Sequence, residues 1–286
     1  MDWLNNIPRI PIGDAIDYAI TLFSDNFSFL TKAFSDVVES GIAILIQGLM
    51  FFPPWVLILA FTALAWFLSR KRSVMLLTLI GLFLIWNMKL WGPMVSTLAL
   101  VLVSTVIAMI IGLPLGIFAA LSQRAYGVIM PILDVMQTMP AFVYLIPAIP
   151  LFGLGPVGAI FSTVIFSMPP AIRLTCLGIR QVPIELVEAA DSFGSTRRQK
   201  LIKLQLPMAT PTIMAGINQT IMLALSMVVI AAMIGAKGLG GEVWKAIQRL
   251  EPSRGFEAGI AIVIVAMILD RIMQRVGGKQ TGATSQ

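Results

Sequence analysis

Charged residues are scarce in this chain, at 12% of 286 residues, whereas soluble domains usually carry about 25%. Histidine is absent and Cys176 is the one cysteine, which excludes an internal disulfide and a zinc site built from cysteines. We therefore expect no metal site. The first residues, Met1 to Leu4, show no basic stretch leading into an apolar core, so a cleavable signal peptide is not expected. The composition excludes an ordinary water-soluble domain.

Hydrophobic residues make up 58% of the chain, and several apolar runs approach or exceed the roughly 18–20 residues that cross a bilayer as a helix. Only helices and closed barrels satisfy their backbone polar groups in lipid. We predict an all-α fold, a polytopic transmembrane helical bundle. Seven spans are expected, near residues 55–69, 74–90, 95–121, 130–151, 156–172, 212–234 and 257–273.

The net charge of +6 comes from residues in short loops, and no basic, aromatic-interleaved domain is present, so nucleic acid is not an expected partner. We interpret the charge as a topology signal. With the N-terminus outside, 13 of the 20 Lys and Arg residues fall in cytoplasmic segments and 7 in outer segments. This predicts a multi-pass protein with an outside N-terminus and a cytoplasmic C-terminus.

The N-terminal region is predicted to form an amphipathic helix near residues 14–38. Apolar side chains recur there at helical spacing: Ile16, Ile20, Phe23, Phe27, Leu30, Phe34 and Val37. Too many charges interrupt the run for it to span, so it is expected to lie on the membrane surface or against the bundle, a coiled-coil contact being the alternative. The predicted regions are an interfacial segment 1–53, two transmembrane helices in 54–92, a core 93–275 with a cytoplasmic loop 173–210, and a tail 276–286.

Glycine and proline mark two unusual spans. Gly112 and Gly116 flank Pro114, a pattern that serves close helix packing or a conformational hinge. Pro140, Pro147 and Pro150 predict a broken helix that borders a cavity.

Neither of two glycine-rich stretches is interpreted as a nucleotide-binding motif. Gly153, Gly155 and Gly158 match G-x-G-x-x-G, but they lie between predicted membrane spans and do not connect a strand to a helix. The stretch 235–241 has no P-loop pattern. We therefore predict no ATP site, no catalytic residue and no cofactor in this chain.

Ionisable residues inside the membrane would be expected in an ion-coupled carrier. The candidates are Asp134 and Asp270, both close to the predicted cytoplasmic ends of their spans. The simpler interpretation makes them interfacial carboxylates near Arg124 or Arg271. The carrier hypothesis is weakened but stays open.

The long cytoplasmic loop is predicted to contain two short helices. Pro183 suits a first helical position, and Gly194 can adopt the left-handed conformation that stops a helix. Thr196 and Gln199 have the spacing of a capping box, and Pro207 is expected to end the second helix.

This loop resembles a family motif. The loop contains Glu188-Ala189-Ala190, then Gly194, and then Leu204-Gln205-Leu206-Pro207. These residues follow the E-A-A-x₃-G-x₉-I-x-L-P pattern of binding-protein-dependent ABC transporter permeases. Leu204 in place of isoleucine is the only departure. The segments 133–147 and 216–230 are similar to the glycine betaine/proline branch of these permeases.

The resemblance implies a type I importer permease whose loop contains a coupling helix for ATPase subunits. The implied coupling residues are Glu188, Ala189, Ala190, Gly194, Leu206 and Pro207. The implied partners are ATPase subunits that bind ATP and Mg²⁺, an extracytoplasmic substrate-binding protein, and a second permease copy, in the bacterial cytoplasmic membrane. An ion-coupled carrier and an osmotically gated channel are the alternatives.

The pathway by which the solute crosses the membrane is expected to be lined by parts of the third, fourth and sixth predicted spans. The candidate residues are Gln137, Thr138, Asn218, Gln219 and Ser226, each of which could instead bond helices together. A quaternary ammonium ligand calls for an aromatic cage. Trp86, Trp91, Tyr144 and Trp244 are scattered along the chain, so the sequence does not choose between betaine, proline, carnitine and choline.

Overall fold

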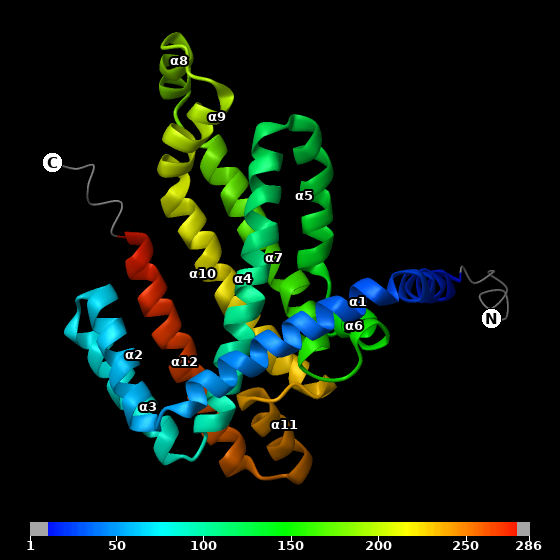
Figure 1. Cartoon of the computed structure of the whole chain (residues 1–286), viewed down its shortest axis with the longest axis vertical. Coiled ribbons are helices and arrows are strands. Elements are labelled where there is room, and N and C mark those ends of the chain that lie inside the picture. The colour runs from blue at the N-terminus through cyan, green and yellow to red at the C-terminus, as the bar shows by residue number, and fades with distance from the viewer. Residues whose placement is uncertain (1–10, 279–286) are drawn as a thin grey trace, which may run out of the picture.

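The computed structural model describes residues 11–278, which form a helical bundle with no strands in that range (Figure 1). The prediction of an all-α fold is confirmed. Within the described residues, four helical stretches are long and apolar enough to cross a membrane, or five if one bent pair counts as a span. They include Trp91–Leu121, Pro156–Arg180 and Arg197–Ile234. The predicted tail begins inside the last helix, and its residues 279–286 lie outside the described part of the chain.

The first helix, α1 (Ile12–Phe51), is longer than the predicted amphipathic segment. It crosses the direction of the other helices and packs against α4 and α6. Phe34 is partly buried, Val38 and Ile42 are buried, but Val37 is 73% exposed. The predicted stripe was therefore wrong at Val37, because the helix buries a row spaced by four residues. The part of α1 from Thr31 to Phe51 has the length and composition of a membrane span. The sequence prediction did not assign a span there.

The helices α2 (Pro54–Ser69) and α3 (Arg72–Asn87) form a hairpin beside the bundle. Pro54 occupies the first turn of α2, where its missing N–H costs nothing, and Arg70 ends that helix in the left-handed conformation. Each helix has 16 residues and is therefore about 24 Å long, against a hydrocarbon core of about 30 Å. The two predicted spans exist as helices, but both are short.

The centre of the bundle consists of α4 (Trp91–Leu121), α7 (Pro156–Arg180) and α10 (Leu206–Ile230). A β-carbon added at Gly116 would lie 2.7 Å from the carbonyl oxygen of Ile172, and one at Gly112 would lie 3.0 Å from Cβ of Ala171. α4 therefore touches α7 through its glycines. Of the two functions proposed for this motif, the structure supports close packing.

The fourth predicted span is broken. It consists of α5 (Gln123–Thr138), the short helix η2 (Ala141–Tyr144) and α6 (Leu145–Phe152), with a bend of 110° between Gln123–Thr138 and Ala141–Phe152. Pro140 precedes the second part and cannot donate the hydrogen bond that would continue α5. The predicted break is confirmed. A cavity of about 270 Å³ is bordered by Pro156 at the start of α7, and no residue of the broken helix lines it.

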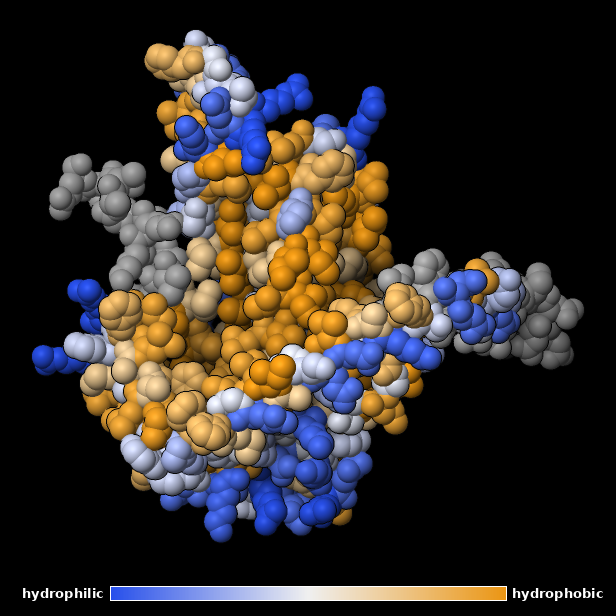
Figure 2. Space-filling model, viewed as in Figure 1, coloured by the Kyte–Doolittle hydropathy of each residue, from blue (hydrophilic) through white to orange (hydrophobic). Residues whose placement is uncertain are grey.

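The last part of the bundle begins with η4 (Ala231–Ile234), which continues α10, followed by α11 (Leu239–Arg249) and α12 (Pro252–Gly278). Figure 1 places α8 and the turn between α4 and α5 at one end, and α11 at the opposite end. Hydrophilic side chains gather at these two ends in the view of Figure 2, with an apolar surface between them. This is the surface expected of a protein that spans a bilayer.

Candidate functional site

The candidate site is the segment between α7 and α10, which projects beyond the apolar surface (Figures 1 and 2). Its first helix is α8 (Ile184–Ser192). Pro183 precedes the helix, and its carbonyl oxygen accepts hydrogen bonds from the N–H groups of Leu186 and Val187. The predicted first-turn proline therefore occupies the capping position, one residue earlier than expected.

Gly194 ends α8 as predicted. Its φ of +72° is in the left-handed region, and the N–H of Ser195 donates to the carbonyl of Ala190 at 3.0 Å. These are features of a Schellman turn. A β-carbon at Gly194 would meet no atom within 4 Å, so the backbone conformation alone requires glycine here.

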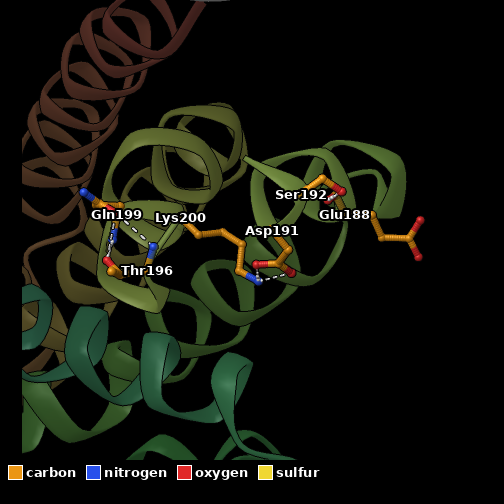
Figure 3. Close-up of polar contacts among 6 residues, drawn as sticks. All are labelled: Glu188, Asp191, Ser192, Thr196, Gln199 and Lys200. Atoms are coloured by element: carbon orange, nitrogen blue, oxygen red, sulfur yellow. Dashed lines mark hydrogen bonds and ion pairs between the residues drawn. The ribbon is translucent and has the colours of Figure 1, made fainter. Parts of the chain in front are cut away.

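The second helix, α9 (Arg197–Lys200), begins with the predicted capping box. The N–H of Thr196 donates to Oε1 of Gln199 at 2.9 Å, and the N–H of Gln199 donates to Oγ1 of Thr196 at 3.3 Å. Nζ of Lys200 lies 2.7 Å from both carboxylate oxygens of Asp191, which joins α9 to α8 (Figure 3). The two short helices therefore hold one another in a defined arrangement.

Pro207 does not end this second helix, and that prediction was wrong. The chain continues from α9 through a π-helical turn, η3 (Leu201–Gln205), into α10, with the N–H of Leu206 donating to the carbonyl of Leu201. The wider turn shifts the hydrogen bonding by one residue and accommodates the proline ring and its missing N–H. A continuous helical rod therefore connects the projecting segment to the membrane core.

The surface of the projecting segment is unusually apolar for a loop. None of the side chains of α8 is buried, and Ile184, Leu186 and Phe193 are 61%, 41% and 90% exposed. Glu188 and Ala189 are also exposed, and the Glu188 side chain points away from the other residues drawn in Figure 3. Ala190 and Leu206 are half-buried, while Pro207 is exposed. Exposed aromatic and aliphatic side chains beside small residues suit docking into the groove of another protein.

Three of the predicted pathway residues form hydrogen bonds with separate partners. The Thr138 and Ser226 hydroxyls donate to the carbonyls of Val135 and Met222 in their own helices. Nδ2 of Asn218 donates to Oδ1 of Asp270 at 3.0 Å, which joins α10 to α12, whereas Oδ1 of Asn218 is buried without a partner among the described residues. Gln137 and Gln219 are exposed on the isolated subunit.

The two candidate carboxylates have partners other than those predicted. Oδ1 of Asp134 lies 2.6 Å from NH2 of Arg173, an arginine on α7, and not near Arg124 as expected. Asp270 accepts hydrogen bonds from Asn218 and from Nε2 of Gln274, at 3.0 and 2.8 Å. Helix packing decides these partners, because it brings residues distant in sequence to the same level of the bundle.

The glycine-rich stretch 153–158 begins in a turn, and two of the aromatic residues singled out in the sequence pack against other aromatic rings. Gly153 and Gly155 have positive φ in the turn between α6 and α7, so this stretch joins two helices rather than a strand to a helix. Within the described residues no group of three His, Cys, Asp or Glu side chains could hold a metal. Of the four aromatic residues scattered along the sequence, Trp86 pairs with Phe83 and Tyr144 pairs with Phe166.

Sequence reasoning missed the polar contacts that α7 makes with α5. The guanidinium of Arg180 lies 4.0 Å from the ring centroid of Tyr126, and its NH2 donates to Oε1 of Gln123 at 2.9 Å. The spacing of Arg173 and Arg180 on one helix face was the available signal. Their partners depend on how the helices pack.

Residues 112–280 match the family model described as "Binding-protein-dependent transport system inner membrane component", and this range includes the capped segment between α7 and α10 with its Glu-Ala-Ala-Gly residues. The chain belongs to this family. Members are permease subunits of ABC importers, multi-pass membrane proteins that work with ATPase and substrate-binding partners. The resemblance found in the loop is confirmed.

Two relatives are similar over most of their length. The chain is 51% identical to the glycine betaine transport system permease protein OpuAB of Bacillus subtilis, covering 97% of this chain and 98% of that protein. It is 47% identical to the glycine betaine/proline betaine transport system permease protein ProW of Escherichia coli, covering 93% of this chain and 74% of that protein.

A solved structure shares the fold. An inward-facing structure of the MetNI methionine ABC transporter matches with a TM-score of 0.63 and 21% identity, over 67% of this chain and 95% of that chain. A second crystal form matches with a TM-score of 0.58 and 20% identity. The bundle is therefore a type I ABC importer permease fold.

Proposed function

We propose that this permease carries a compatible solute of the glycine betaine type across the cytoplasmic membrane, driven by ATP hydrolysis in partner subunits. The observation that carries the proposal is the self-supporting α8–α9 segment, with its exposed Phe193 and Ala189 and its continuous connection to α10. The substrate class rests on the relatives, which are named as glycine betaine permeases.

In this proposal α8 is the coupling helix. Glu188 and Ala189 are presented to the ATPase groove, Ala190 and Gly194 fix the turn behind them, and Leu206 and Pro207 form the start of the rod that carries motion into the core. Because Asp191 and Lys200 join α8 to α9, a push on α8 moves both short helices together. The chain supplies no catalytic group to ATP hydrolysis.

We further propose a homodimer with each N-terminus outside and each C-terminus in the cytoplasm. Gln137 and Gln219 are exposed polar residues on membrane helices, and lipid is an unfavourable environment for them. A second copy, or the water-filled pathway between two copies, would remove that cost. Thr138, Asn218 and Ser226 would line or support the same pathway.

The first experiment replaces Ala189 by Trp and Gly194 by Val in the complex with its ATPases and binding protein. The bulky side chain blocks close docking, and valine at positive φ carries a penalty of roughly 1–2 kcal/mol or more. Both variants should reach the membrane at normal levels and lose glycine betaine uptake and substrate-stimulated ATP hydrolysis. Gly194→Asn is the matched control, because asparagine tolerates the left-handed conformation, and it should retain most uptake.

Normal coupled uptake by both Ala189→Trp and Gly194→Val would remove α8 from the mechanism. The permease alone in proteoliposomes should neither hydrolyse ATP nor accumulate glycine betaine when a proton or sodium gradient is imposed. Strong gradient-driven uptake by the permease alone would instead establish an ion-coupled carrier.

A further inference from the structure

Two arginines of α7 face α5. Arg173 and Arg180 are seven residues apart, which places them on the same side of the helix about two turns from one another. NH2 of Arg173 donates to Oδ1 of Asp134 at 2.6 Å. NH2 of Arg180 donates to Oε1 of Gln123 at 2.9 Å, and the same guanidinium covers the ring of Tyr126. We call these five residues the α7–α5 clamp.

The clamp matters because α5 buries few side chains, although it also packs against α4. Only Ala125 and Leu133 are buried among the side chains of α5. Charge-assisted hydrogen bonds and cation–π contacts are stronger than ordinary polar contacts, and more so when they are partly enclosed. The clamp therefore adds directional bonds between α5 and α7. Because Arg173 and Asp134 are 39% and 65% exposed, this ion pair sets the relative position of the two helices more than it stabilises the fold.

The clamp also joins two parts of the chain that have separate roles. Arg180 is the last residue of α7, and α8 begins at Ile184. At the other end of the clamp, Asp134 lies one helical turn before Gln137 and Thr138, next to the bend of 110° in the broken span. NH2 of Arg180 also donates to the carbonyl of Ala119 in α4, at 3.3 Å, so the base of the clamp touches a third helix.

The tight packing of α7 makes it suitable for transmitting force. A β-carbon at Gly116 of α4 or at Gly178 of α7 would approach a neighbouring helix closer than normal contact allows. Such a packed helix moves as a unit rather than deforming. By contrast, α5 buries few side chains, and the clamp gives it directional bonds to α7.

We propose that Arg173 and Arg180 are positioning residues that make α5 move with α7 during transport. In this arrangement, the ATPase displaces α8, and the end of α7 moves with it. The clamp then moves α5, whose last residues, Gln137 and Thr138, precede the bend in the broken span. The proposal rests on the proposed function, because it takes α8 as the element that receives the motion. Neither arginine contacts the solute.

The test uses the complex with its ATPases and binding protein, reconstituted in proteoliposomes, with glycine betaine uptake and ATP hydrolysis measured in the same sample. Arg173→Gln and Arg180→Gln should each lower the uptake per ATP hydrolysed by about 2- to 30-fold, the range expected for loss of a coupling contact. Membrane level and ATPase attachment should equal those of the unmodified complex. Arg124→Gln removes an exposed arginine of α5 that forms no side-chain hydrogen bond or ion pair within residues 11–278, and it should leave this ratio unchanged.

Exchanging the charges of Arg173 and Asp134 distinguishes a role in transmitting motion from a role in helix packing alone. Arg173→Asp alone should uncouple strongly, because it places two carboxylates together, and addition of Asp134→Arg should recover most of the uptake per ATP hydrolysed.

The proposal is overturned if Arg173→Gln and Arg180→Gln keep the normal ratio while Ala189→Trp remains uncoupled, an outcome that leaves the role of α8 intact. It is also overturned if both single variants fail to assemble and the reversed pair does not restore assembly. Normal coupling in Ala189→Trp would instead refute the proposed function itself.

Discussion

At the scale of single residues, two glycines illustrate different physical requirements. Gly116 has a normal helical conformation, but its α-carbon lies so close to α7 that a side chain would meet the backbone of Ile172. Gly194 has open space around it, but its φ is positive. The first position is therefore restricted by packing and the second by backbone conformation.

Gly116→Leu should reduce stability by about 1–3 kcal/mol, the cost of overpacking a well-packed contact. Gly127→Leu is the matched control, because a β-carbon there meets nothing within 4 Å, and it should change stability little. Thermal unfolding of the purified permease in detergent, followed by size-exclusion chromatography, measures the difference. Equal unfolding temperatures for the two variants would contradict the close α4–α7 packing.

At the scale of elements, the projecting segment between α7 and α10 is organised mostly by its own residues. The capping box, the left-handed Gly194 and the Asp191–Lys200 ion pair all connect residues less than ten positions apart. Side-chain exposure in the ion pair is 17% for Lys200 and 53% for Asp191, so solvent screens part of the attraction. The ion pair should therefore adjust the arrangement of α8 and α9 rather than create it.

Lys200→Met should accordingly lower the affinity of the permease for its ATPase by less than about fivefold, because exposed ion pairs contribute about 0.2–1 kcal/mol. Lys203→Met, an exposed neighbour without a recorded ion pair among the described residues, should have no effect. Titration of labelled ATPase against the permease in nanodiscs gives both affinities. Complete loss of binding in Lys200→Met alone would show that the ion pair determines the fold of the segment.

At the scale of the whole molecule, the basic residues agree with the arrangement of the helices. The turn between α2 and α3, which contains Lys71, lies toward the same end of the bundle as α8 and the C-terminal end of α12, whereas α11 lies at the other end (Figure 1). This turn therefore contributes basic residues to the end that contains the proposed coupling helix. From the positive-inside rule we propose that this end is cytoplasmic.

In a Cys176→Ala background, a cysteine at Ser253 should react with an impermeant thiol reagent added outside intact cells. A cysteine at Ser195 should react only after the membrane is made permeable. Ser253 is exposed at the start of α12 and Ser195 lies in the turn after α8, so the two positions report the two ends of the bundle. Labelling in the opposite pattern would reverse the proposed orientation.

The sequence by itself determined the features that depend on nearby residues. The apolar runs predicted the bundle because a bilayer demands long helices, and Pro140 predicted the broken span because proline lacks the N–H that a helix needs. The caps of α8 and α9 followed from Gly194 and Thr196 for the same local reason. The family motif was readable because it lies in one short segment.

Tertiary structure alone decided the features that depend on which helices become neighbours. Asp134 meets Arg173 rather than Arg124, and Asp270 meets Asn218, because the packing of α5, α7, α10 and α12 brings these residues to the same level. The crosswise course of α1 and the burial of Val38 in place of Val37 depend on the surface that α4 and α6 offer. The helix continues through Pro207 because a wider turn can absorb a missing N–H, an option that residue preferences do not reveal. Contacts between distant residues are set by packing of the whole chain, so no local pattern could specify them.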